Sequence, residues 1–301
     1  MKDPQHTGFV LVDKPGGWTS HDVVAKTRRL AGQRKIGHAG TLDPMATGLL
    51  VLGLGRATRL LRFVQHGVKE YVATVRLGVA TDSLDADGAV LSREPMPVGL
   101  ADVESVLPRF LGSIHQVPPM VSARKVEGRR LYELAREGTE VEREARPVEI
   151  QEIEILDFAP SDYPELSFRV RCSTGTYVRS LADDIARALG GRGHLVALRR
   201  TKNGRLGVEQ ATALEDLAAL ADEGRFADAV MGAAQGLADM EAIHVDRARS
   251  AAVRNGVPFA ATSLGAAPGS SGPFRMLDDA GVLLAVYRID GGKAKPEVVV
   301  A

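Results

Sequence analysis

The chain has 301 residues and contains almost no cysteine, since Cys172 is its only thiol. One cysteine excludes an internal disulfide and a metal site built from clustered thiolates. No apolar run approaches the roughly 20 residues that a membrane-spanning helix needs. The first residues also lack the apolar core of a secretory signal. These absences predict a cytoplasmic protein that does not associate with membranes.

The usual sequence motifs of metal and nucleotide sites are missing as well. His38 and Asp43 lie five residues apart, but no His-x-x-x-His or Cys-x-x-Cys pattern accompanies them, so we expect no metal. Gly37-x-x-Gly40 is too short for a P-loop, and Gly53-Leu54-Gly55 is not completed to a dinucleotide-binding motif. Cys172 falls on an inward-facing strand position, which favours a buried thiol over a nucleophile. After metal, nucleotide-loop and thiol chemistry are set aside, chemistry by a carboxylate remains.

The charge of the chain is balanced, with 38 basic and 38 acidic residues. Taken alone, a net charge of zero argues weakly against a nucleic-acid partner. Local positive potential matters more for phosphate binding than net charge. Each basic cluster can also be an ordinary solvated surface. The clusters, which lie next to Gly-rich or Pro-rich loops, are Arg28, Arg29, Arg34 and Lys35; Arg124, Lys125, Arg129 and Arg130; and Arg199, Arg200, Lys202 and Arg205.

Strand and helix patterns are interspersed without regular βαβ repeats, which favours an α+β domain on a central, largely antiparallel mixed sheet. Near residue 240 the character changes to a short helix, a Gly/Ala/Ser/Pro-rich stretch and a predicted hairpin. We therefore expect a main domain over 1–240, with a protruding insertion over 118–147, and a small β-rich domain over 241–301. The predicted strands cover 9–14, 49–52, 70–77 and 168–172; the predicted helices run from an N-cap at Ser20 to Gly32, over 101–111, around 131–136, and from Thr176 to Gly190.

The most informative stretch is Gly37–Gly48, GHAGTLDPMATG, which precedes the apolar run Leu49–Leu52. This pattern indicates a loop feeding a buried strand, with glycines that leave room for a ligand. Asp43 can be a reactive carboxylate or a simple Asp-Pro turn residue. Arg179 stands in the first turn of a predicted helix, where the macrodipole disfavours a cation. Its placement suggests a specific role, for example pairing with a buried carboxylate, although the same spacing also fits a solvated helix residue.

The stretch over residues 37–48 closely resembles the catalytic motif of the bacterial tRNA pseudouridine-55 synthases, the TruB family. Four more motifs agree in order: VDKPGG at 12–17, KEY at 69–71, GTYVRS at 175–180 and LRR at 198–200. The resemblance covers about residues 8–210. In the tail, residues 255–256 and 295–297 are similar to a PUA-type RNA-binding domain. The resemblance implies a pseudouridine synthase fold followed by a PUA-like domain.

The resemblance also implies the reaction and its residues. Uridine 55 in the T-loop of tRNA becomes pseudouridine without a cofactor, and Asp43 acts as a nucleophile at C1′ or as a base at C2′. Arg179 pairs with Asp43, while Tyr71 stacks on the flipped-out base and assists the loss of the C5 proton. Further substrate contacts are expected from Lys14, His38, Tyr177 and Leu198, and RNA-backbone contacts from Arg124, Lys125, Arg129 and Arg130 of the insertion together with Arg199 and Arg200.

The expected partner is the T arm of tRNA, bound by a monomer with no obligatory protein partner. Three alternatives stay open at this point. The chain could modify another RNA, such as rRNA or an RNA selected by a guide. It could be a tRNA-folding chaperone in which the chemistry is secondary. It could also be a sugar- or nucleotide-processing hydrolase that uses Asp43.

Overall fold

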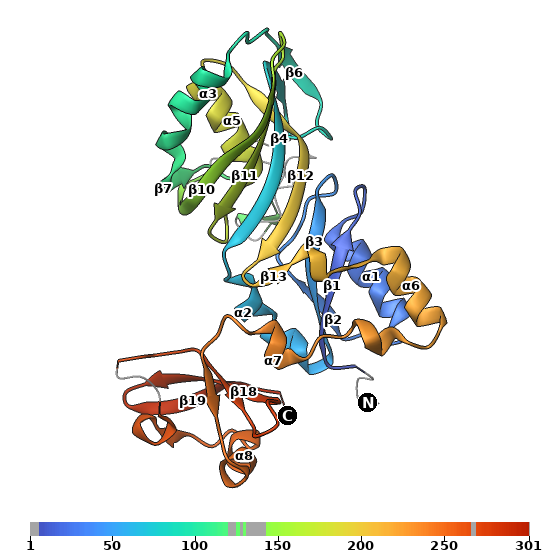
Figure 1. The fold of residues 1–301 in the computed structure, drawn as a ribbon, viewed down its shortest axis with the longest axis vertical. Coiled ribbons are helices and arrows are strands. Elements are labelled where there is room, and N and C mark those ends of the chain that lie inside the picture. The colour runs from blue at the N-terminus through green and yellow to red at the C-terminus, as the bar shows by residue number, and fades with distance from the viewer. Residues whose placement is uncertain (1–5, 120–124, 127–128, 131–142, 266–268, 301) are drawn as a thin grey trace.

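The structure is a computed structural model that describes residues 6–119, 125–126, 129–130, 143–265 and 269–300. Figure 1 shows an elongated molecule, in which one sheet runs through most of the length and a smaller sheet lies at the end that carries the C-terminus. Arg124 and the helix predicted around residues 131–136 lie outside the described residues. Within the described ranges, no helix is long and apolar enough to cross a membrane.

The large sheet has the strand order β14-β1-β3-β12-β4-β11-β10-β7, with β2 on β3 and β13 on β12. In the described part of the sheet, β1 with β14 and β3 with β12 are the parallel pairs, and all others are antiparallel. The expectation of a largely antiparallel mixed sheet is therefore confirmed. The strands are β1 (Gly8–Lys14), β2 (Ile36–Ala39), β3 (Thr47–Leu54), β4 (Lys69–Leu77), β7 (Gly112–Gln116), β10 (Arg146–Ala159), β11 (Glu165–Cys172), β12 (Gly193–Asn203), β13 (Leu206–Gly207) and β14 (Thr212–Ala213).

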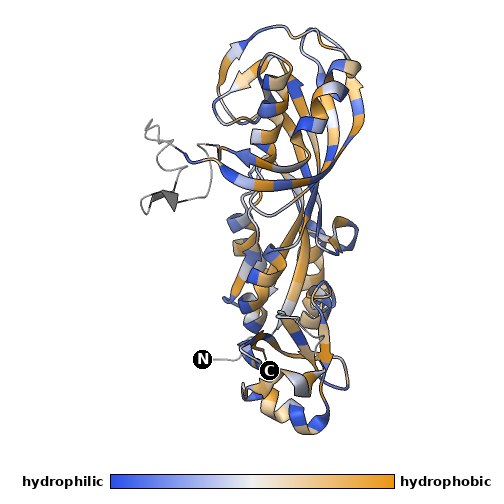
Figure 2. Cartoon of the chain, turned by 90° about the vertical axis from the view of Figure 1, so that its left-hand side faces the viewer, coloured by the Kyte–Doolittle hydropathy of each residue, from blue (hydrophilic) through white to orange (hydrophobic). Residues whose placement is uncertain are grey.

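The central strands of this sheet are buried on both faces. Along β1, Val10 and Val12 belong to one apolar cluster, whereas Phe9 and Leu11 belong to another. The same alternation runs along β3, which explains its uninterrupted apolar sequence, because a strand covered on both faces needs no polar side. In Figure 2 the strands in the middle of the molecule are mostly orange, the colour of hydrophobic residues.

Helices cover one face of the sheet, and short helices together with the C-terminal sheet cover the other. The first cluster includes Val23 of α1, Val103 of α3 and Leu181 of α5, while the second joins Leu60 to Val286 of the C-terminal sheet. The helices, with 3₁₀ helices written η, are α1 (Ser20–Leu30), η1 (Gly55–Leu60), α2 (Leu61–Gln65), α3 (Leu100–Val106), η2 (Leu107–Phe110), α5 (Val178–Ala188), η3 (Val208–Gln210), α6 (Leu214–Asp222), η4 (Phe226–Ala229) and α7 (Ala233–Gly236).

Residues 242–300 build a smaller sheet with its own apolar cluster around Phe274 and Tyr287. The predicted hairpin is present, because β17 and β18 pair antiparallel, and the predicted short helix is α8. The division of the chain at residues 240 and 241 stays a prediction. The strand order is β15 (Ala242–His244), β17 (Phe274–Leu277), β18 (Leu283–Asp290), β19 (Lys293–Val299) and β16 (Phe259–Ala260), with α8 (Arg247–Arg254) and η5 (Ala261–Leu264) as helices.

Two short hairpins project from the large sheet. One pairs β5 (Val79–Thr81) with β6 (Val90–Arg93). The other pairs β8 (Lys125–Val126) with β9 (Arg129–Arg130), inside the predicted insertion. The insertion thus has a described hairpin, and its closing residues, 146–147, already belong to the edge strand β10.

The first helix begins one residue earlier than its predicted cap implies. Thr19, not Ser20, is the N-cap, since its side chain accepts from the amide of Asp22 and the Asp22 carboxylate accepts from the amide of Thr19. Ser20 is buried and hydrogen-bonds Leu42 instead. The residue predicted to cap a helix therefore holds the loop that carries Asp43.

Candidate active site

The stretch from Gly37 to Gly48 is a strand followed by a loop. Residues 37–39 belong to β2, which pairs with β3, and residues 40–46 connect the two strands. The prediction of a loop was therefore wrong for residues 37–39, which belong to β2, and for residues 47–48, which belong to β3. Gly48 has a φ of +96°, and a side chain there would collide with the backbone of Arg200. The start of β3 is thus closely packed against β12.

Lys14 and Ser20 hold this loop from the N-terminal segment. Lys14 is fully buried, and its Nζ donates to the carbonyl oxygens of Trp18 at 2.6 Å and Pro44 at 3.2 Å. Ser20 Oγ accepts from the Leu42 amide at 2.9 Å. Burial lowers the pKa of Lys14 to about 8. Lys14 was expected to contact substrate, but its ammonium group is enclosed by backbone carbonyls and positions the loop instead.

Arg200 is also part of the support of the loop. It is 1% exposed, and its Nε donates to the Leu49 carbonyl at 2.7 Å. Its Nη2 donates to the Gly40 carbonyl at 3.2 Å, so that one guanidinium joins both ends of the loop. The expected contact with an RNA phosphate does not fit this burial, because the guanidinium already serves the backbone of the loop.

Arg179 lies in the first turn of α5, as the sequence predicts, and binds two carboxylates at once. Its Nε and Nη2 lie 3.0 Å from Oδ2 and Oδ1 of Asp43, a two-pronged ion pair. Its Nη1 lies 3.0 Å from Oδ2 of Asp85. The predicted pairing of Asp43 with Arg179 is confirmed. The two carboxylates compensate for the unfavourable position of a cation at a helix N-terminus.

Asp85 is the residue that the sequence interpretation missed. It belongs to the acidic stretch over residues 81–88, to which the sequence assigned no function, and it is only 4% exposed. Ser83 donates from its hydroxyl to the Asp85 carboxylate, and Thr81 donates to the Asp85 carbonyl at 2.8 Å. The available signal was the hydroxyl residues around this aspartate, which can satisfy a buried carboxylate.

Asp43 is the member of this network that faces outward. Its side chain is 34% exposed, whereas the side chains of Arg179 and Asp85 are 4% and 6% exposed. Burial raises the pKa of the Asp43 carboxyl above its ordinary value, the Arg179 guanidinium opposes this shift, and the nearby Asp85 charge adds to it. Both oxygens of the Asp43 carboxylate are thus held by Arg179, while the side chain stays accessible to a ligand.

Tyr71 and Leu198 form an apolar wall near the carboxylate. They lie on the neighbouring strands β4 and β12, are 7% and 8% exposed, and belong to the same apolar cluster. Burial raises the pKa of the Tyr71 phenol, Arg200 opposes the shift, and the charge of Asp43 adds to it. The phenol is therefore neutral at physiological pH. The Tyr71 phenol thus lies close enough to Asp43 to feel its charge, and its contact with substrate stays a prediction.

Tyr177 directly precedes α5, and His38 lies on β2, the strand that leads into the loop of Asp43. The Tyr177 amide, directly before α5, donates to Oε1 of Gln116 at 3.0 Å. His38, on β2, meets the ring of His21 edge-on with centroids 5.3 Å apart. Burial lowers the pKa of His38, and its Nδ1 has no hydrogen-bond partner among the residues that the structure describes. A neutral imidazole with a free nitrogen suits contact with a neutral polar ligand.

Arg199 is a predicted phosphate contact whose side chain is accessible. This side chain is 41% exposed, and its guanidinium binds both oxygens of Asp13, at 3.0 and 2.7 Å. Lys125, Arg129 and Arg130 lie in the β8–β9 hairpin, where the structure describes the backbone. Over the described ranges, no group of three or more His, Cys, Asp or Glu side chains comes together as a metal site would require.

Solved structures with this architecture are known. A chain in a Cbf5-Nop10-Gar1 complex matches 98% of this chain and is itself covered to 85%, with 26% identity and a TM-score of 0.78. A chain in the archaeal box H/ACA sRNP Nop10-Cbf5 complex matches at 26% identity with a TM-score of 0.74, and the coverage is 98% and 86%. The fold and its arginine-held aspartate place the chain in the class of pseudouridine synthases.

Sequence comparisons narrow this class. The N-terminal domain model of TruB family pseudouridylate synthase matches residues 28–178, and the C-terminal domain model of tRNA pseudouridylate synthase B matches residues 179–240. The tRNA pseudouridine synthase B of Thermobifida fusca is 46% identical, with 98% of each chain covered. That of Mycobacterium leprae is 43% identical, covering 97% of this chain and 90% of the relative. The chain belongs to the TruB family and is an isomerase, as its five motifs predict.

Proposed function

We propose that this chain converts uridine to pseudouridine at position 55 of the T-loop of tRNA. The observation that carries the proposal is the carboxylate of Asp43, accessible but held on both oxygens by Arg179 at 3.0 Å. Relatives named tRNA pseudouridine synthase B over nearly the whole chain support tRNA as the substrate. The motifs of residues 37–48 support the T-loop and position 55.

The reaction begins from ionised Asp43 by one of two routes. The carboxylate attacks C1′ of the ribose as the C1′–N1 bond breaks, or it removes the C2′ proton and the same bond breaks to leave a glycal. The electron pair of the broken bond leaves with N1 of uracil. After the base rotates, C5 bonds to C1′. On the first route this displaces the Asp43 carboxylate from C1′, and on the second route protonated Asp43 returns its proton to C2′. The C5 proton is then lost and N1 gains a proton. The carboxylate is regenerated, so the sum is an isomerisation.

The surrounding residues take supporting roles in this proposal. Arg179 keeps Asp43 ionised and oriented, Tyr71 stacks on the flipped-out base, and Leu198 and Tyr177 line its pocket. His38 supports the displaced RNA. Lys14 and Arg200 position the loop through their backbone contacts, and Arg199 exchanges Asp13 for an RNA phosphate. The insertion and the PUA-like domain over 241–301 bind the T arm, and the enzyme acts as a cytoplasmic monomer without a protein partner.

The pH dependence of turnover follows from Asp43. Since the ionised carboxylate reacts and burial raises the pKa of Asp43, activity is lost as the pH falls through a value above the ordinary pKa of about 4 for an aspartate. The expected profile of kcat/KM shows an acid limb above that value. An acid limb at or below it would contradict the described environment of the carboxylate.

Salt sensitivity tests the assignment of RNA-backbone contacts. If Arg199 and the basic insertion bind phosphates, log Kd for tRNA rises linearly with log salt concentration, because counterions are released on binding. Four to six such contacts weaken binding by roughly 10²- to 10³-fold between 50 and 200 mM salt. Titration of labelled tRNA at several salt concentrations measures this slope. A flat dependence would remove the phosphate contacts from the proposal.

Release of tritium from tRNA transcripts that carry [5-³H]uridine tests the reaction itself, because C5 loses its hydrogen as it bonds to C1′. We expect stoichiometric release from one uridine per tRNA, with no free uracil. Release from rRNA fragments only would favour another RNA substrate, and free uracil would favour a hydrolase. A protein that aids tRNA folding but releases no tritium would be a chaperone without this chemistry.

A further inference from the structure

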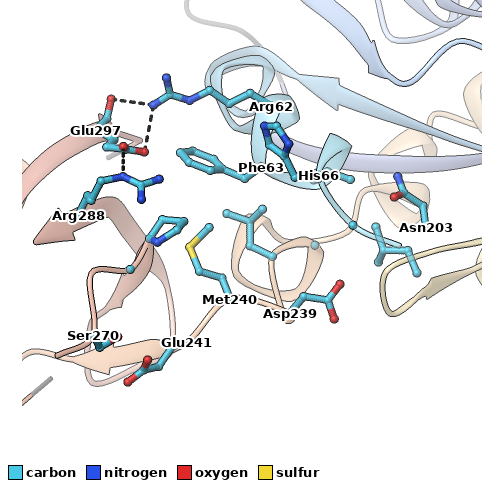
Figure 3. A pocket seen from close by; sticks show the side chains of 17 residues that line it. Arg62, Phe63, His66, Asn203, Asp239, Met240, Glu241, Ser270, Arg288 and Glu297 are labelled. Atoms are coloured by element: carbon cyan, nitrogen blue, oxygen red, sulfur yellow. Dashed lines mark hydrogen bonds and ion pairs between the residues drawn. The ribbon is translucent and has the colours of Figure 1, made fainter. Parts of the chain in front are cut away.

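A cavity of about 730 Å³ lies outside the site described above, between the catalytic sheet and the C-terminal sheet. Its wall comes from α2 and the turn that follows it, from the end of β12, and from the strands β18 and β19. Figure 3 shows Arg62, Arg288 and Glu297 at one end of the cavity, Asn203 at the other, and Phe63, His66 and Met240 between them. The volume lies in the range of small-molecule sites.

The main part of the chain and the C-terminal sheet, which both contribute residues to the cavity, are joined by hydrogen bonds from η1. Arg56 donates to the carbonyl of Val300 at 3.2 Å, and Arg59 donates to the carbonyl of Val299 at 3.0 Å. These arginines follow each other at a spacing of three residues, which places them on one side of a 3₁₀ helix. The cavity is therefore formed by tethered surfaces before any ligand binds.

Asn203 gives the cavity its most specific feature. It is 2% exposed, and neither its Nδ2 nor its Oδ1 has a hydrogen-bond partner within the part of the chain that the structure describes. A buried amide without partners is costly, so such groups are rare unless a ligand or water completes them. An asparagine amide presents one donor and one acceptor side by side, which matches N7 and the N6 amino group of adenine.

The opposite end of the cavity offers positive charge. Glu297 accepts from both Arg62, at 3.4 Å, and Arg288, at 2.6 Å. One carboxylate thus faces two guanidiniums, and their side chains are still 54% and 45% exposed. The remaining positive charge suits a phosphate, which guanidinium groups bind through paired hydrogen bonds.

Phe63 supplies a flat apolar surface between these ends. The guanidinium of Arg62 lies 4.7 Å from the centre of its ring, which keeps the ring oriented. Any nucleobase can stack on such a ring, because every base has a flat π-face. Amide, aromatic ring and guanidiniums therefore follow one another as base edge, base face and phosphate do in a nucleotide.

We propose that this cavity binds one unpaired adenosine nucleotide of the RNA substrate, outside the T arm. The adenine edge bonds Asn203, its ring stacks on Phe63, and its phosphate lies between Arg62 and Arg288. The statement that this nucleotide belongs to the RNA substrate rests on the proposed function. The affinity of the cavity for an adenine nucleotide rests on the described residues alone.

Steady-state kinetics on two substrates test whether the bound nucleotide is part of the RNA substrate. Asn203→Leu removes the donor and acceptor at similar volume, and it should not lower the melting temperature, because the amide has no described partner to lose. Phe63→Leu removes the stacking surface. Each variant should raise KM for a full-length tRNA about tenfold, the effect of one base contact, with kcat unchanged. KM for the isolated T-arm stem-loop should stay at the wild-type value.

Gln151→Leu, which removes an exposed side-chain amide on β10, is the control and should change neither KM. An unchanged KM for full-length tRNA in both cavity variants would overturn the RNA assignment, and so would an equal rise for the stem-loop. Absence of pseudouridine from both substrates with the wild-type protein would instead refute the proposed function.

Saturation-transfer NMR with adenosine and uridine 5′-monophosphate tests the chemistry of the cavity without turnover. We expect signals from the adenine nucleotide, weaker signals from the uracil nucleotide, and loss of the adenine signals in Asn203→Leu. Equal binding of both nucleotides, or unchanged binding in the variant, would overturn the adenine assignment. Adenine-specific binding with an unchanged KM for tRNA would identify a site for free nucleotides and overturn the RNA source.

Discussion

Asp43→Asn is expected to lower the rate of pseudouridine formation at least about 10³-fold while tRNA affinity stays within about twofold of the wild type. The amide keeps the shape of the side chain but can neither attack C1′ nor remove the C2′ proton. Binding should persist, because the phosphate contacts lie on other residues and Arg179 still pairs with Asp85. Single-turnover tritium release and a tRNA binding titration measure the two quantities separately.

Asp216→Asn makes the same chemical change on the exposed surface of α6 and should leave both quantities unchanged. If Asp43→Asn abolished tRNA binding together with turnover, Asp43 would have a structural role and its catalytic assignment would be wrong. If the variant turned over at a rate near that of the wild type, the reaction would depend on another group.

Arg179→Lys is expected to reduce kcat about 10²-fold and to move the acid limb of the pH profile upward. A lysine keeps the charge, but it cannot hold both oxygens of Asp43 while also reaching Asp85, as the fork of the guanidinium does. A small loss of orientation at the reacting group costs about this factor. With a weaker ion pair, burial raises the pKa of Asp43 further, so protonation sets in at a higher pH.

Arg187→Lys, on the same helix, is the control, because Arg187 pairs with Asp183 and its side chain is 56% exposed. It should behave as the wild type, since exposed pairs contribute little. The rate and the acid limb of Arg179→Lys should change together. A reduced rate with an unshifted acid limb would show that Arg179 acts without influencing the ionisation of Asp43.

Much of the fold could be predicted from local sequence patterns. Alternation along residues 168–172 correctly placed Cys172 inside, and burial of the thiol raises the pKa of Cys172 to about 11. The unusual position of Arg179 at a helix start predicted its pairing with a carboxylate, because one local rule was broken and a tertiary contact had to compensate. The pseudouridine synthase fold followed from five motifs in order.

The parts that were missed depend on contacts between distant segments. Lys14 and Arg200 were assigned to substrate and RNA by the family resemblance, and nothing in the sequence contradicted this, since basic side chains are rarely fully buried. Both are buried because the backbone carbonyl groups of residues 40, 44 and 49 accept hydrogen bonds from them. No pattern within residues 12–17 or 198–200 predicts those acceptors. Asp85 was missed for the same reason. Its acidic turn has the composition of a surface turn, and only its contact with the distant Arg179 explains why it is buried.

Mapping of pseudouridine at single-nucleotide resolution in a tRNA transcript is the most direct test of the central claim. After treatment with the wild-type protein, the modification is expected at uridine 55 and at no other position, and it should be absent after treatment with Asp43→Asn. Modification at another uridine, or the same modification from the Asp43→Asn protein, would contradict the account.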